Sequence, residues 1–108
     1  MLITSGFKNW LLQRISAVIL TVYILFLAGF CFTQPVITYA VWHKLFSCEL
    51  MKFATLFMLL ALGIHSWLGI WTVTTDYLKS ASIRLCLQTA VYIVLLFYLV
   101  WGVQILWG

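Results

Sequence analysis

The sequence predicts an all-α integral membrane protein with three transmembrane helices and a cytoplasmic N-terminus. Of its 108 residues, 66% are hydrophobic and 7% are charged, and its mean hydropathy of +1.15 lies far above that of soluble domains. The six basic and two acidic residues gather in three short segments, and the uncharged runs that separate and follow these segments are long enough to cross a bilayer. Because the chain has no room for a large polar domain, we expect a subunit of a complex in which another polypeptide handles soluble substrates.

The apolar runs give the positions of the spans, which are expected at about residues 13–33, 53–75 and 85–107. Residues 1–7 show no periodicity, and Phe7–Arg14 has the aromatic and charged side chains of an interfacial turn or short helix. The first long helix should therefore begin near Gln13. Pro35, the only proline, should mark its end or lie in the following loop. We expect residues 1–108 to form a single membrane-anchor domain.

The two connections between the spans differ in character. Residues 34–51 hold an aromatic and basic mixture typical of a segment at the membrane interface, which predicts a short amphipathic helix there. Glu49 suits the start of the second long helix, because a negative charge stabilises the positive end of the helix dipole. The second connection, Asp76–Arg84, is short and polar.

The basic residues predict the orientation of the chain. In a three-span protein the N-terminus and the second connection share one side, and these segments carry Lys8, Arg14, Lys79 and Arg84. The positive-inside rule places that side in the cytoplasm. The net charge of +4 is dispersed beside apolar runs, which fits membrane flanks and not a nucleic-acid partner. The three cysteines lack the C-x-x-C spacing of zinc or dithiol sites.

His65 is a candidate functional residue because it lies near the middle of its predicted span, where ionisable side chains are usually functional. It shares a helical stripe with Gly69 and with Asp76, which lies about 16 Å further along the axis. The imidazole could ligate haem iron, with Gly69 and Gly63 leaving room for the macrocycle. Alternatively, it could bond to a Ser or Thr of another helix. The chain has no second histidine at this depth, so a bis-histidine haem would need a partner subunit.

Asp76 and Tyr77 lie where the second long helix should leave the membrane. A quinone could place its carbonyl groups at this depth, where a phenol can donate a hydrogen bond and a carboxylate can orient it or move protons. On the residues alone, an aromatic-belt tyrosine and a solvated aspartate are the simpler interpretations. Arg14 could pair with a haem propionate or with Asp76, and its simpler interpretation is a basic flank of a span.

Two segments carry a resemblance to a known family. They are Leu11–Tyr23 (LLQRISAVILTVY) and Ile64–Lys79 (IHSWLGIWTVTTDYLK). With the three spans and the unequal connections, they resemble the hydrophobic membrane anchor subunit of bacterial succinate dehydrogenase, the D subunit of respiratory complex II. The most specific part is the H-x-W-x-G-x-W run that is followed by the Asp-Tyr pair.

The resemblance implies specific roles for the candidate residues. His65 would be an axial ligand of haem b, with the other ligand on the second anchor, the cytochrome b (C) subunit. Tyr77 would hydrogen-bond ubiquinone, Asp76 would support that site, and Arg14 would lie near the haem propionates and the quinone pocket. The iron–sulfur and flavoprotein subunits would be further partners. The chain would then be a non-catalytic subunit, in the bacterial inner membrane, that links succinate oxidation in the tricarboxylic acid cycle to ubiquinone reduction.

Two other classes of function are considered beside this one. A small transporter or channel could use His65 and Asp76 to line an ion path, although compact multidrug exporters normally have four spans and a glutamate in the first. A passive assembly anchor would hold no cofactor. The presence of haem would distinguish the succinate dehydrogenase anchor from both of these alternatives.

Overall fold

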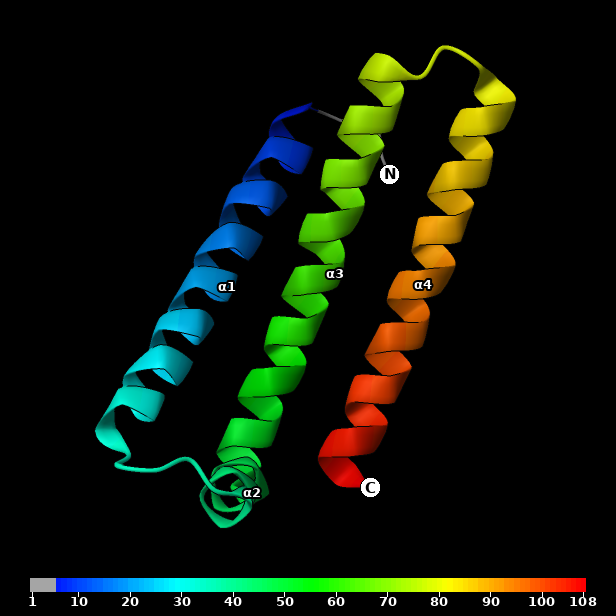
Figure 1. Ribbon diagram of the computed structural model, residues 1–108. Helices are drawn as coiled ribbons and strands as arrows, with labels where there is room; N and C mark the ends of the chain where they lie inside the picture. The colour runs from blue at the N-terminus through cyan, green and yellow to red at the C-terminus, as the bar shows by residue number, and fades with distance from the viewer. Residues whose placement is uncertain (1–5) are drawn as a thin grey trace.

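The computed structural model describes residues 6–108, and over this range the chain forms four α-helices (Figure 1). They are α1 (Gly6–Thr33), α2 (Tyr39–Ser47), α3 (Glu49–Tyr77) and α4 (Ala81–Trp107). The helices α1, α3 and α4 are each long and apolar enough to cross a membrane, for which about 20 residues suffice. The prediction of an all-α membrane protein with three spans is confirmed, and the first connection does contain a short helix.

Local sequence signals explain where these helices begin. The side chain of Thr38 accepts a hydrogen bond of 3.2 Å from the backbone N–H three residues later and so caps α2. Ser80 caps α4 in the same way, at 3.4 Å. Such caps satisfy backbone donors of the first turn that have no partner within the helix. Glu49 is the first residue of α3, at the positive end of the helix dipole.

The first long helix begins earlier than the sequence predicts. α1 starts at Gly6 and continues without a break past Lys8 and Arg14, so the expected separate turn or short helix before Gln13 is wrong. Charged side chains do not interrupt a helix, because the backbone hydrogen bonds are made within the helix on both sides of the membrane boundary. The remaining part of the N-terminal segment, residues 1–5, lies outside the residues that the structure describes.

α3 is the central helix of the bundle and packs against both α1 and α4 (Figure 1). The start of α1, the end of α3 and the start of α4 lie at one end, and α2 lies at the opposite end. The first of these ends carries Lys8, Arg14, Lys79 and Arg84. The basic residues used to predict the orientation therefore do lie at a common end of the molecule.

Polar bonds link the helices, while most of the large apolar side chains are exposed. The hydroxyl groups of Tyr23 on α1 and Thr55 on α3 lie 2.7 Å apart and are buried. The side-chain amide of Gln88 on α4 donates to the hydroxyl of Thr74 on α3 at 2.6 Å. Moving an apolar side chain from lipid into a helix interface gains little hydrophobic free energy. Interhelical hydrogen bonds and close packing therefore hold membrane helices together. The exposed apolar faces suit contact with lipid and with other subunits.

We expect Tyr23→Phe to lower the stability of the bundle by about 1 kcal/mol, because the ring stays while the interhelical hydrogen bond to Thr55 is lost. Detergent-induced unfolding of the purified complex, followed by helix content, measures this change. Tyr98→Phe is the control, since Tyr98 is exposed on α4. An equal loss of stability in both variants would contradict the assignment.

Candidate functional site

The mid-span histidine makes a polar contact with the neighbouring helix. His65 is half-buried on α3, and its Nδ1 atom lies 3.1 Å from the hydroxyl oxygen of Ser16 on α1. Ser16 is buried, and its hydroxyl oxygen lies 3.0 Å from the backbone carbonyl oxygen of Gln13, to which it can donate. Within residues 6–108, the Nε2 atom of His65 has no hydrogen-bond partner. One ring nitrogen is therefore engaged and the other is available.

A glutamine and a glycine extend this contact toward the basic end of the bundle. A Cβ atom at Gly69 would lie 3.8 Å from the side-chain nitrogen of Gln13, so α1 approaches α3 closely here. The side-chain oxygen of Gln13 is buried with no hydrogen-bond partner among the described residues. Gly63 faces open space and is rotated by about 200° around α3 from His65. Of the two glycines, only Gly69 shares the face of His65.

Asp76 and Tyr77 lie together at the exposed end of α3. Both side chains are accessible to solvent. Immediately after them, the guanidinium group of Arg84 donates to the backbone carbonyl of Leu78 at 3.1 Å, which ties α4 to the end of α3. This hydrogen bond stabilises the turn between α3 and α4. The side chains of Asp76 and Tyr77 remain open to a ligand or a partner subunit.

Arg14 lies on α1 and does not join the other candidates. Its guanidinium carbon is 5.3 Å from the ring centre of Trp10, which is a cation–π contact. In the part of the chain that the structure describes, no ion pair links Arg14 to Asp76. The structure therefore brings Asp76 and Tyr77 together, and it leaves Arg14 and His65 apart from that pair.

His65 can offer one ring nitrogen to a haem iron, but it is not part of a complete metal site. Residues 6–108 contain no cluster of three or more His, Cys, Asp or Glu side chains that could hold a metal ion. The other histidine, His43, lies on α2 at the opposite end of the bundle, where its Nδ1 atom is 3.3 Å from the hydroxyl of Ser47. The available Nε2 atom of His65 is of the kind that binds haem iron, and the described part of the chain brings no second histidine beside it.

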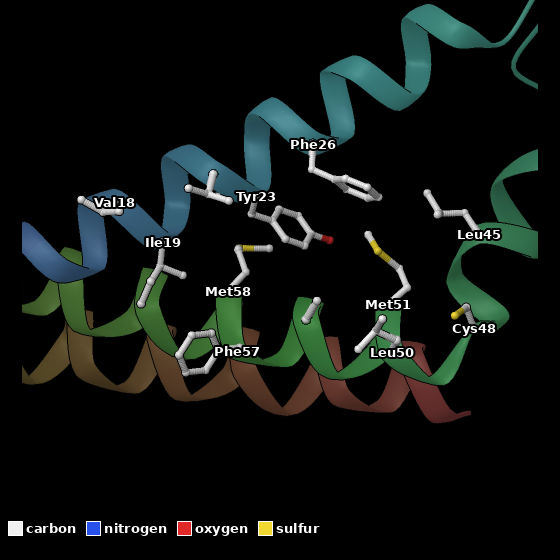
Figure 2. A pocket seen from close by; sticks show the side chains of 12 residues that line it. Val18, Ile19, Tyr23, Phe26, Leu45, Cys48, Leu50, Met51, Phe57 and Met58 are labelled. Carbon is white, nitrogen blue, oxygen red and sulfur yellow. The ribbon is translucent and has the colours of Figure 1, made fainter.

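An apolar groove of about 560 Å³ opens between α1 and α3 near α2. Figure 2 shows α1 diverging from α3 along this groove, with the ring of Tyr23 directed into the gap and Phe26 and Met51 beside it. None of His65, Asp76, Tyr77 or Arg14 lines the groove. The groove is therefore separate from the candidate haem and quinone residues.

Two residues near His65, Ser16 and Gln13, were not predicted from the sequence. A Ser or Thr partner for His65 was expected as an alternative to haem, but its identity depends on how α1 and α3 are rotated against each other. The available signal was that Gln13 and Ser16 are polar, occur three residues apart in an apolar segment and so share a helix face.

Comparison with known proteins assigns the chain to a family. Residues 3–103 match the family described as succinate dehydrogenase/fumarate reductase transmembrane subunit. The chain is also 40% identical, over 102 residues, to the succinate dehydrogenase hydrophobic membrane anchor subunit of Coxiella burnetii (strain RSA 493 / Nine Mile phase I). That alignment covers 94% of this chain and 89% of the relative. The resemblance read from the sequence is confirmed: the chain belongs to the family of succinate dehydrogenase and fumarate reductase transmembrane subunits.

Proposed function

We propose that this chain anchors succinate dehydrogenase in the bacterial inner membrane, gives haem b one axial ligand through His65, and forms part of the ubiquinone-reducing site with Tyr77 and Asp76. The anchor role follows from the family and from the three apolar helices. Succinate oxidation belongs to the flavoprotein subunit. This chain is a non-catalytic subunit that couples that oxidation to quinone reduction.

One observation supports the haem role: the Nδ1 atom of His65 contacts Ser16, while its Nε2 atom has no hydrogen-bond partner among the described residues and is available. Histidine ligands of metals commonly bond to protein through their second nitrogen, which orients the ring. Bound haem supplies one-electron redox chemistry. A histidine of the second anchor, the cytochrome b subunit, provides the other ligand in this proposal, because His43 lies at the far end of the bundle.

The quinone role rests on the accessibility of Tyr77 and Asp76 at the end of α3, where the hydrogen bond from Arg84 to the Leu78 carbonyl stabilises the turn. The Tyr77 hydroxyl donates a hydrogen bond to a quinone carbonyl oxygen and so stabilises the negative charge that this oxygen gains on reduction. Asp76 orients this group or passes protons to it. Arg14, at the same end, offers its guanidinium group to haem propionates or to the reduced quinone.

The same proposal includes orientation and partners. We expect the Asp76 end and the N-terminus to face the cytoplasm, because the basic residues Lys8, Arg14, Lys79 and Arg84 gather there. The iron–sulfur and flavoprotein subunits dock on this side, because electrons must arrive where the quinone is reduced. The exposed apolar helix faces contact lipid and the second anchor. We also propose that residues 1–108 form one membrane-anchor domain, since α1 and α4 both pack on α3.

A reduced-minus-oxidised absorption spectrum of the purified complex tests the haem role. We expect a low-spin haem b signal with a stoichiometry of one haem per copy of this chain, because each copy offers one mid-span histidine. Protein content and extracted haem, measured on the same sample, give the ratio. A colourless complex that still reduces ubiquinone would contradict the haem role and would leave a cofactor-free anchor.

A further inference from the structure

The hydroxyl group of Ser16 has one hydrogen and two neighbouring acceptors. Its oxygen lies 3.0 Å from the carbonyl oxygen of Gln13 and 3.1 Å from Nδ1 of His65. A neutral imidazole carries its proton on only one of its two nitrogens. The position of the hydroxyl hydrogen is therefore linked to the position of the imidazole proton.

The two possible arrangements differ in the number of hydrogen bonds that form. If Ser16 donates to the Gln13 carbonyl, the Nδ1–H group of His65 donates to Ser16, and two hydrogen bonds result. If Ser16 donates to Nδ1, the imidazole proton must be on Nε2, and only one of these bonds remains. The Nε2–H group would then have no partner among the described residues.

Burial decides between these arrangements. Ser16 is only 3% exposed and His65 is half-buried, and both residues lie well inside helices that are apolar enough to cross a membrane. An unpaired N–H group in such surroundings costs free energy, because no water can replace the missing acceptor. The arrangement with two hydrogen bonds is favoured, and it leaves a lone pair on Nε2.

We propose that Ser16 is a positioning residue that holds His65 as the Nδ1–H tautomer and orients the ring so that Nε2 offers its lone pair to the haem iron. The proposal rests on the haem role of His65 stated above. The Gln13 carbonyl takes part by accepting the hydroxyl hydrogen. Because an acceptor on Nδ1–H makes the imidazole a stronger donor to iron, Ser16 stabilises oxidised haem and lowers its midpoint potential.

Redox titration of the haem in the intact complex tests this role. Ser16→Ala removes the acceptor without adding volume, and we expect the midpoint potential to shift to a more positive value. Ser16→Thr keeps the hydroxyl and should keep the wild-type potential. Tyr23→Phe is the matched control, since it removes the other side-chain hydroxyl bond between α1 and α3, about two turns along α1. Its potential should equal that of the wild type.

The outcomes separate this inference from the function on which it rests. An unchanged potential in Ser16→Ala, or an equal shift in Ser16→Thr or Tyr23→Phe, overturns the role of the Ser16 hydroxyl. If His65→Ala loses the haem while Ser16→Ala keeps the wild-type potential, only the present inference fails. If His65→Ala keeps an unchanged low-spin haem, the ligand assignment fails and the role of Ser16 fails with it.

Discussion

The low-spin haem b signal is expected to disappear from the purified complex when His65 is replaced by alanine. Alanine cannot donate to iron, and no other histidine of this chain lies in the middle of a span. Loss of groups that merely support a metal ligand already weakens binding by roughly 10- to 100-fold, so loss of the ligand itself should reduce haem content by at least about 10-fold. Reduced-minus-oxidised spectra and extracted haem per complex measure the effect.

His43→Ala is the matched control for this experiment. It removes the other histidine of the chain, which is exposed on α2 at the far end of the bundle, and haem content should remain unchanged. The low-spin spectrum persisting in His65→Ala would rule out His65 as an axial ligand. Equal loss in both variants would instead point to failed assembly, and subunit composition on gel filtration would show it.

The fold was largely predictable because long uncharged runs must form helices to satisfy their backbone in a bilayer. The ends of the helices were less predictable, because hydropathy changes at the membrane surface while a helix can continue into water. α1 therefore begins at Gly6 and not near Gln13, and α4 begins at Ala81 and not at Leu85. The cap on α4 is Ser80, whose side chain marks the start of the helix independently of hydropathy.

The candidate site was only partly predictable. His65 is conspicuous because an imidazole in an apolar run needs a partner, and Asp76 and Tyr77 gained roles through the family resemblance. The bond between His65 and Ser16 joins residues 49 positions apart, and it depends on the relative depth and rotation of two helices. The polar pair Gln13 and Ser16 is visible in the sequence, but no local pattern encodes that rotation, so their position beside His65 emerges only from the packing of α1 on α3.

Tyr77→Phe should reduce succinate-dependent ubiquinone reduction by roughly 10- to 100-fold. The substitution keeps the ring but removes the donor to a quinone oxygen that becomes negative on reduction. A hydrogen bond to such a group contributes about 1.5–3 kcal/mol, which corresponds to this range of rates when the bond forms fully in the transition state. Succinate oxidation by an artificial dye should stay unchanged, because the flavoprotein subunit is not altered. Parallel assays of the same purified complex with ubiquinone and with dye measure the difference.

Tyr39→Phe separates the loss of a quinone contact from the loss of any exposed tyrosine hydroxyl. Tyr39 is 80% exposed and Tyr77 is 77% exposed, and the two residues lie at opposite ends of the bundle. A donor to the quinone must lie at the end where electrons arrive, so Tyr39→Phe should retain full ubiquinone reduction. Equal losses in the two variants, or a parallel fall of the dye assay in Tyr77→Phe, would mean that Tyr77 does not act at the quinone. A selective loss of ubiquinone reduction in Tyr77→Phe, with haem content and dye reduction both measured as unchanged, is the result expected from a direct contact of Tyr77 with the quinone.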